Sequence, residues 1–220
     1  QKAVHAFAQT RRLTSYQRSG ALRQLLELLH QREEAFTRLI IQEAGKPWRA
    51  AKAEVERAFH TLETAAEEAK RIGGEILPMD VAPKGAGVTG IVARFPIGPI
   101  AAITPFNFPL NLALHKIAPA IASGNPIVVK PSPRTPLTLI ALAKLIAQLD
   151  LPPGAVSIMP FSNALAARMA ADDRFGMLTF TGSAPVRWAL KARAGKKRVV
   201  LELGGNAAVI IDRDANLDEA

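Results

Sequence analysis

Residues 99–133 read PIAAITPFNFPLNLALHKIAPAIASGNPIVVKPSP, and the pattern of this segment indicates the fold class most clearly. Ile100 to Ile103 is a short apolar run, as expected for a strand that is buried on both faces. Pro109 then opens a helix that ends near Ser123-Gly124. A second apolar run, Pro126 to Val129, follows directly. A strand, a helix and a further strand in succession predict a parallel sheet.

The same alternation continues to the end of the chain. Further helices are predicted at 135–149, 163–171 and 184–194, further strands at 155–159, 177–180 and 199–203, and a candidate sixth strand at 207–211. Thr135 and Ser183 are the expected N-caps of two of these helices. The pattern predicts an α/β fold, with a Rossmann-like parallel sheet and helices on both faces.

The chain before this region is predicted to be helical as far as residue 76. Gly45 and Pro47 separate two helices, and Gly73-Gly74 ends the last one. The apolar positions with helical spacing are Leu22, Leu25, Leu26, Leu29, Phe36, Leu39, Ile40, Val55, Ala58, Phe59, Leu62, Ala65, Ala66 and Ala69. We expect these helices to pack on the sheet domain and to carry no catalytic residue.

Residues 77–98 contain a motif in the wrong context. Gly85-Ala86-Gly87-Val88-Thr89-Gly90 matches the dinucleotide fingerprint, which requires a strand before it and a helix after it. Here a proline-containing segment precedes the glycines, and Ile91, Val92 and Phe95 give the following residues the character of a strand. We therefore predict a hairpin or arm with a glycine-rich turn.

Composition restricts the classes of function. The 220 residues are 49% apolar, contain no cysteine and include no apolar run long enough to span a membrane, so a cytoplasmic protein is expected. The four histidines have no metal-ligand spacing, so no metal site is expected. Because the chain opens on Gln1, further residues are expected to precede it.

The net charge of +9 raises the alternative of nucleic-acid binding. The densest basic run, Lys191 to Arg198, has no aromatic residues within it. It follows a predicted helix, where cations interact favourably with the helix dipole. We therefore interpret it as a solvated helix terminus and turn, and we expect no nucleic-acid partner.

Chemically distinctive residues follow the predicted strands. Asn107 follows the first strand, Lys130 the second, Ser183 the fourth, and Glu202 lies in the fifth. Each has a structural alternative: a turn amide, a snorkelling lysine, a simple helix cap and an ion-paired acid. Because the carboxyl ends of parallel strands share one edge, together they favour a nucleotide site there.

Four ordered motifs resemble the aldehyde dehydrogenase superfamily: Pro105-Phe106-Asn107-Phe108-Pro109, Val129-Lys130-Pro131-Ser132, Phe180-Thr181-Gly182-Ser183 and Leu201-Glu202-Leu203-Gly204-Gly205. The resemblance covers the whole chain. It implies N-terminal helices over 1–76, an oligomerisation arm over 77–98 and an NAD(P)-binding domain over 99–220. It also implies a homo-oligomer, a dimer or a tetramer, that oxidises a small aldehyde with NAD or NADP. Residues 91–109 resemble branches that act on lactaldehyde or phosphonoacetaldehyde.

The resemblance also implies roles for particular residues. Asn107 would hold the oxyanion that forms when a cysteine attacks the aldehyde, and Glu202 would activate the water that releases the thioester. Lys130 would contact the adenosine ribose, and Gly182 with Ser183 the pyrophosphate. Other residues expected at the cofactor are Ile103, Thr104, Pro105, Phe106, Ser132, Pro133, Val186, Leu203 and Gly204.

The chain departs from the family pattern at several positions. Arg187 replaces a common glycine, residues 160–163 lack common glycines, and Pro133 replaces an acid typical of NAD-preferring members. With Arg134 beside Pro133, tolerance of NADP is expected. The nucleophilic cysteine is expected beyond Ala220, so one alternative is an inactive fragment that only binds NAD(P) or is a structural remnant. Another is an acylating relative, against which Glu202 argues.

Overall fold

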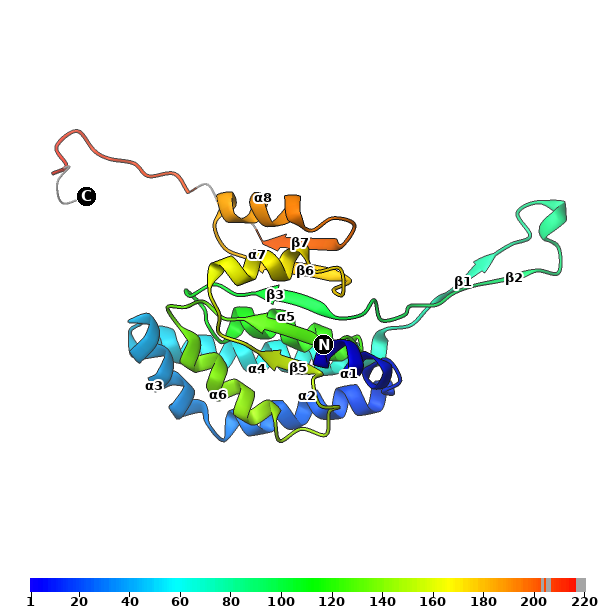
Figure 1. Ribbon diagram of the computed structural model, residues 1–220, viewed down its shortest axis with the longest axis horizontal. Coiled ribbons are helices and arrows are strands. Elements are labelled where there is room, and N and C mark those ends of the chain that lie inside the picture. The colour runs from blue at the N-terminus through cyan, green and yellow to red at the C-terminus, as the bar shows by residue number, and fades with distance from the viewer. Residues whose placement is uncertain (203, 205–206, 217–220) are drawn as a thin grey trace.

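The computed structural model describes residues 1–202, 204 and 207–216 (Figure 1). The helices are α1 (Lys2–Thr10), α2 (Ser15–His30), α3 (Glu33–Ala44), α4 (Trp48–Arg71), α5 (Asn111–Ala122), α6 (Pro136–Ile146), α7 (Asn163–Ala171) and α8 (Ala184–Arg193), with a 3-10 turn η1 at Pro83–Gly85. The strands are β1 (Glu75–Pro78), β2 (Thr89–Val92), β3 (Ile100–Ile103), β4 (Ile127–Lys130), β5 (Val156–Ile158), β6 (Met177–Thr181) and β7 (Arg198–Glu202).

Within these described residues, five strands form one parallel sheet in the order β5-β4-β3-β6-β7. Alternate residues of β3 enter different cores: Ile100 and Ala102 face α5 and α6, whereas Ala101 and Ile103 face α7 and α8. Helices therefore cover both faces (Figure 1), which confirms the predicted α/β fold. The chain reverses direction across the sheet between β3 and β6, and ligands bind outside such a switch point.

Helices α2, α3 and α4 pack outside α5 and α6 as a further layer (Figure 1). The predicted apolar face of α4 is buried, and its small side chains lie against α2 and α5. Gly45 ends α3 with a φ of 66°, the left-handed conformation that glycine adopts without strain. The structure confirms the predicted helices as far as Arg71, whereas residues 75–76 belong to β1. The predicted apolar positions are buried except Leu26 and Leu39, which are half-buried.

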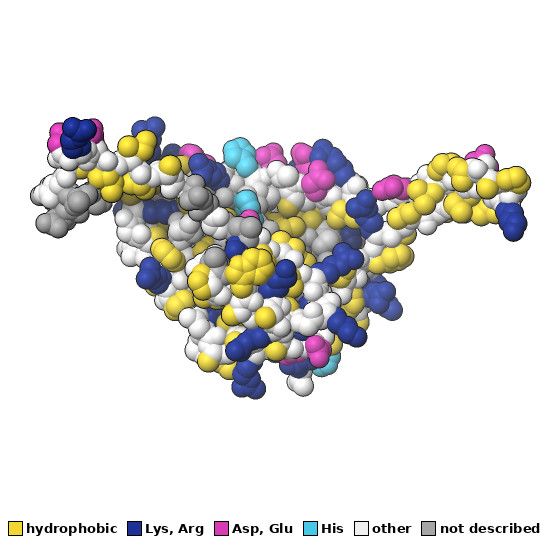
Figure 2. Space-filling view, turned by 90° about the horizontal axis from the view of Figure 1, so that it is seen from above, with side chains coloured by type: hydrophobic (Ala, Val, Ile, Leu, Met, Phe, Trp, Pro, Cys, Tyr) yellow, Lys and Arg dark blue, Asp and Glu magenta, His cyan; other side chains and the backbone are white. Residues whose placement is uncertain are grey.

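The predicted hairpin is also present. β1 and β2 pair antiparallel, with Glu75 opposite Val92 and Pro78 opposite Thr89, and the arm extends away from the body (Figure 1). The residues of the glycine motif form η1 and the start of β2, not a helix N-terminus. Apolar side chains remain exposed on the arm (Figure 2), including Ile76 at 79% and Ile91 at 74%.

Several sequence predictions were wrong in detail. Residues 207–211 form no strand, because a strand needs a neighbour to pair with and none of the described strands pairs with this run; Ile210 is 94% exposed. The helix expected from Pro109 begins at Asn111, and the one expected to reach 149 ends at Ile146. None of the helices that the structure describes is long and apolar enough to traverse a bilayer.

Candidate cofactor and catalytic site

The sheet register brings the predicted site residues to one edge. Ile103 lies opposite both Lys130 and Phe180 in the neighbouring strands, and Thr181 lies opposite Glu202. Asn107, which follows β3, and Gly182 and Ser183, which follow β6, therefore belong to the carboxyl edge on either side of the switch point. Of the other predicted residues, Leu203 lies outside the described part of the chain, as does Gly205 of the same motif.

Glu202 is the last residue of β7. Its side chain is exposed, and its Oε2 accepts a hydrogen bond of 2.7 Å from the Thr181 hydroxyl. Val199 and Leu201 pack against the α7–α8 core, so alternation along the strand places Glu202 on the other face, toward α5. The acid in the apolar run is thus a solvent-facing group with a hydroxyl partner.

Lys116, on α5, is a site residue that the sequence interpretation missed. It is only 7% exposed, and its Nζ donates a hydrogen bond of 3.0 Å to Thr179 Oγ1 on β6. Burial lowers the pKa of Lys116 to about 8, and the negative charge of Glu202 acts in the opposite direction. A lysine within the apolar pattern of 112–121 was the available sequence signal.

Lys130 is also buried rather than extended into solvent. Its Nζ donates to Asn163 Oδ1 at 3.1 Å and to the carbonyl of Pro131 at 3.3 Å, and burial lowers its pKa. Ser132 is buried, and its Oγ accepts a hydrogen bond from the backbone of Arg134. The interpretation of Lys130 as a snorkelling lysine is therefore wrong.

The four helices packed on the sheet differ at their N-termini. Carboxylates from the helical layer cap two of them: Glu54 accepts from Leu110 and Asn111 at α5, and Glu43 accepts from the backbone of Leu137 and Thr138 at α6. At α7 the Ser162 hydroxyl accepts from Leu165.

At α8 the expected cap, Ser183, has the N-cap position but makes no side-chain capping bond. Thr135 likewise makes none at α6, because Glu43 already serves that terminus. Among the described residues no side chain caps α8, so the backbone N–H groups of its first turn, apart from Pro185, which has none, are available to an anion, which the helix dipole favours. Gly182 is required just before this helix, since a Cβ there would lie 2.6 Å from the Phe180 ring.

Arg187 lies in the first turns of α8. It is only 6% exposed, and its Nε and Nη1 have no hydrogen-bond partner among the residues that the structure describes. The guanidinium lies over the Trp188 ring at 5.0 Å, while Val186 beside it is exposed. Helical side chains lean toward the N-terminus of their helix, so this cation belongs to the open end of α8. A buried guanidinium without an acceptor is costly and marks a place for an anion.

The loop after β3 carries Asn107, whose side chain is exposed. Phe106 lies beneath the Arg134 guanidinium at 4.6 Å, and Phe108 beneath the Lys46 ammonium at 3.6 Å. The remaining predicted residues differ in exposure: Ile103 and Thr104 are buried, Pro105 is half-buried, and Pro133 and Gly204 are exposed. A Cβ on Gly204 would meet no atom of the described residues within 4 Å.

A cavity of about 560 Å³ lies on the α5 face of the sheet rather than at its carboxyl edge. Its floor includes Met177, Thr179 and Val200, and its wall includes His115 and Lys116. Arg18 and Arg94 also line it. The cavity is therefore basic in character, and Lys116 belongs both to it and to the surroundings of Glu202.

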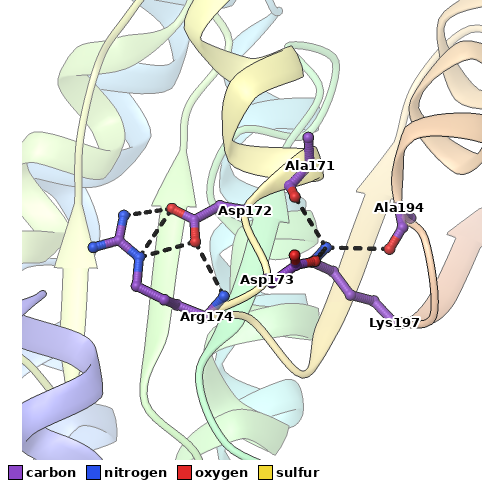
Figure 3. Close-up of polar contacts among 6 residues, drawn as sticks. All are labelled: Ala171, Asp172, Asp173, Arg174, Ala194 and Lys197. Atoms are coloured by element: carbon purple, nitrogen blue, oxygen red, sulfur yellow. Dashed lines mark hydrogen bonds and ion pairs between the residues drawn. The ribbon is translucent and has the colours of Figure 1, made fainter.

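The basic run after α8 is only partly solvated. The Lys197 side chain is almost fully buried, and its Nζ donates to the carbonyls of Ala171 and Ala194 and to the Asp173 carboxylate (Figure 3). It thereby joins the C-terminal ends of α7 and α8. The expectation of a fully solvated run was wrong for Lys197, because carbonyls at the two helix ends accept hydrogen bonds from its ammonium.

The sequence profile of the aldehyde dehydrogenase family matches residues 1–220. The chain is 40% identical to 3-sulfolactaldehyde dehydrogenase of Priestia aryabhattai over 93% of its own length and 43% of that protein. Aldehyde dehydrogenase 21 from Physcomitrella patens, solved with the reaction product succinate, superposes with a TM-score of 0.91 at 46% identity, over 94% of this chain and 43% of that one.

An NADP-dependent glyceraldehyde-3-phosphate dehydrogenase from Bacillus halodurans, solved with NADP, superposes with a TM-score of 0.88 at 32% identity, over 93% of this chain and 43% of that one. The chain thus spans less than half the length of the relatives it matches. The profile match over all 220 residues, with the fold just described, establishes that the chain belongs to the aldehyde dehydrogenase family.

Proposed function

We propose that this chain forms the dinucleotide-binding part of an enzyme that oxidises an aldehyde to a carboxylic acid with NAD or NADP. The observation that supports the proposal is the shared edge of the sheet. Thr181 and Glu202 end the neighbouring strands β6 and β7 there, and α8 begins just after β6. Residues 1–220 contain no cysteine, so in this proposal the attacking thiolate comes from residues outside them.

Two residues of this chain act on the reacting atoms. When the thiolate attacks the aldehyde carbon, the carbonyl oxygen becomes an oxyanion, and the Asn107 amide donates a hydrogen bond to it. Such a donor is worth about 3 kcal/mol at the transition state. When bound, the dinucleotide would supply the acceptor for the hydride, and loss of the hydride would leave a thioester. The Glu202 carboxylate then takes a proton from a water molecule, the water oxygen attacks the thioester carbon, and the C–S bond breaks to release the carboxylic acid and the thiolate.

The environment of Glu202 supports its role as the base. The Thr181 hydroxyl fixes one carboxylate oxygen, and the other is free to accept a proton from water. Lys116 approaches from α5 and contributes positive charge when protonated.

The residues present fit a dinucleotide. The N–H groups at the start of α8, with Ser183, suit the pyrophosphate, and Arg187 supplies a buried cation whose Nε and Nη1 have no hydrogen-bond acceptor among the described residues. Lys130 suits the adenosine ribose. Pro133 introduces no negative charge near the ribose hydroxyls, and Arg134 is exposed beside it, so a 2′-phosphate is tolerated and NADP is accepted.

We propose a small aldehyde with an anionic group as the substrate. Two of the relatives named above have acidic ligands: one is named for a sulfonated aldehyde, and the other was solved with succinate. The cavity lined by Arg18, Arg94, His115 and Lys116 supplies matching positive charge. The exposed apolar arm, β1 with β2, is proposed to pair with further copies of the protein in a homo-oligomer.

The test is reduction of NAD and NADP by the intact protein with pairs of small aldehydes that do or do not carry a sulfonate or carboxylate. We expect turnover without added coenzyme A and a kcat/KM at least about tenfold higher for the anionic member. Dinucleotide binding with no reduction for any aldehyde would support the alternative, a chain that only binds NAD(P). Turnover that requires coenzyme A would support the acylating relative.

A further inference from the structure

We propose that Lys46 and Glu54, two residues of the N-terminal helical layer, are positioning residues that hold the Asn107 amide in place. This inference rests on the proposed function, because it concerns how the oxyanion-binding loop is fixed. Neither residue is near the strand ends in sequence. Hydrogen bonds and a cation–π contact connect both residues to the loop on one side of Asn107, and a separate contact secures the other side.

Glu54 links the helical layer to the start of α5. Its side chain is completely buried on α4, and its Oε1 accepts hydrogen bonds from the backbone of Leu110 at 2.9 Å and Asn111 at 3.2 Å. These are N–H groups at the beginning of α5 that have no partner within the helix. A carboxylate at this position also interacts favourably with the helix dipole. Glu54 therefore fixes the chain a few residues after Asn107.

Lys46 joins Glu54 to the residue next to Asn107. Its Nζ lies 2.7 Å from Glu54 Oε2 and 3.6 Å from the centroid of the Phe108 ring. The ammonium compensates the buried carboxylate and also holds the ring by a cation–π contact. The carbonyl of Phe108 accepts a hydrogen bond from Leu112. Ring and backbone of Phe108 are thus both fixed.

The preceding residue, Phe106, is held independently. Its ring lies 4.6 Å from the Arg134 guanidinium, which belongs to the loop after β4. Among the described residues, the Asn107 amide itself has no hydrogen-bond partner, and its side chain is exposed. Its position is therefore set by its two neighbours, while its N–H groups remain free for a developing oxyanion. Such fixed donors act without reorganisation during the reaction.

Glu43 offers a matched comparison. It caps the N-terminus of α6 as Glu54 caps that of α5, also from the helical layer and also through two backbone N–H groups. Among the described residues, its hydrogen bonds go to Leu137 and Thr138, and none goes to the loop that carries Asn107. A substitution of Glu43 therefore removes a helix cap without affecting the contacts around Asn107, whereas a substitution of Glu54 affects both.

The test uses the intact enzyme and the rate of the first turnover, seen as a burst of NAD(P)H. We expect Lys46→Met to slow the burst on the order of tenfold, as misplacement of a catalytic group does. The dissociation constant of the cofactor should change less than about twofold, because the phosphate contacts are elsewhere. Lys46→Arg keeps the cation and should restore most of the rate. Glu54→Gln should resemble Lys46→Met, whereas Glu43→Gln should lower the melting temperature without slowing the burst.

A double-mutant cycle with Asn107→Ala decides the interpretation. If Lys46 acts through Asn107, the double variant is no slower than Asn107→Ala alone. Independent, multiplicative effects, or a burst that Lys46→Met leaves unchanged while the melting temperature falls, would show a purely structural role and overturn the inference. An Asn107→Ala variant with an undiminished burst would instead refute the proposed function, so the two failures are distinguishable.

Discussion

The hydroxyl of Thr181 on β6 donates a 2.7 Å hydrogen bond to the carboxylate of Glu202 on β7, and the two residues are register partners. The bond exists because adjacent residues on one face of a parallel pair project in the same direction. It fixes an exposed carboxylate that otherwise has several rotamers. The proposed base is therefore oriented by its neighbouring strand before any ligand binds.

Thr181→Val should impair thioester hydrolysis selectively. The loss of one hydrogen bond, about 1 kcal/mol, corresponds to roughly fivefold in rate. We expect the NAD(P)H burst to persist and the steady-state rate to fall by that factor in the intact enzyme. Thr181→Ser keeps the hydroxyl and serves as the control. A burst and steady state that slow equally would contradict the assignment of Thr181 to the hydrolytic step.

The buried Lys116 ammonium makes the free energy of unfolding depend on pH in the alkaline range. Its pKa is about 8 in the folded state against 10.5 as the ordinary value, so between these pH values the unfolded chain binds more protons. The cost of burying its charge is present in full below about pH 8 and is relieved as pH rises toward 10.5. In urea unfolding, the free energy of unfolding of the wild type should therefore rise over this pH interval relative to that of Lys116→Met. A difference between the two proteins that does not change with pH would contradict the burial of the Lys116 ammonium.

Lys197 should matter for stability more than its exposed partner does. Its ammonium donates to two helix-terminal carbonyls, whereas the Asp173 side chain is 99% exposed (Figure 3). We expect Lys197→Met to lower the free energy of unfolding by about 1–3 kcal/mol, because the carbonyls lose a charged donor. Asp173→Asn should leave the unfolding midpoint unchanged, since exposed ion pairs contribute little. Equal losses in both variants would show that the ion pair, not the carbonyls, is important.

Arg134 should influence the choice of cofactor. Its guanidinium lies over Phe106 and is exposed beside Pro133, where a 2′-phosphate would add negative charge. Calorimetric titration of Arg134→Met should show NADP binding weakened about tenfold and NAD binding nearly unchanged, the usual scale of one charged hydrogen bond. Tight NAD binding together with no NADP binding by the wild-type protein would overturn the expected tolerance of NADP.

The sequence predicted the sheet and its edge because these depend on local patterns. Ile100 to Ile103 is apolar throughout, and a parallel sheet places Asn107, Lys130 and Glu202 near one edge whatever the details of packing. The residues around Gly85 likewise sufficed to predict that its glycine motif is not a dinucleotide-binding loop, since a strand and not a helix follows it.

What the sequence did not predict depends on contacts between distant segments. Glu54 caps a helix more than fifty positions along the chain, and Glu43 displaces Thr135 from its expected role, yet both acids lie in ordinary helical patterns. Lys116 meets Thr179 only after α5 packs on the sheet. The run at 207–211 has the composition of a strand, but no described strand pairs with it, so the sixth strand predicted from composition was wrong.

Glu202 is proposed to activate water for thioester hydrolysis. A single-turnover measurement on Glu202→Gln in the intact enzyme is the sharpest test of this role. Glutamine keeps the size of the side chain and can still accept the hydrogen bond from Thr181, but it cannot take a proton from water. We predict a burst of one equivalent of NAD(P)H per subunit, followed by turnover slowed at least about a hundredfold. Steady turnover at the wild-type rate after the burst would contradict the account.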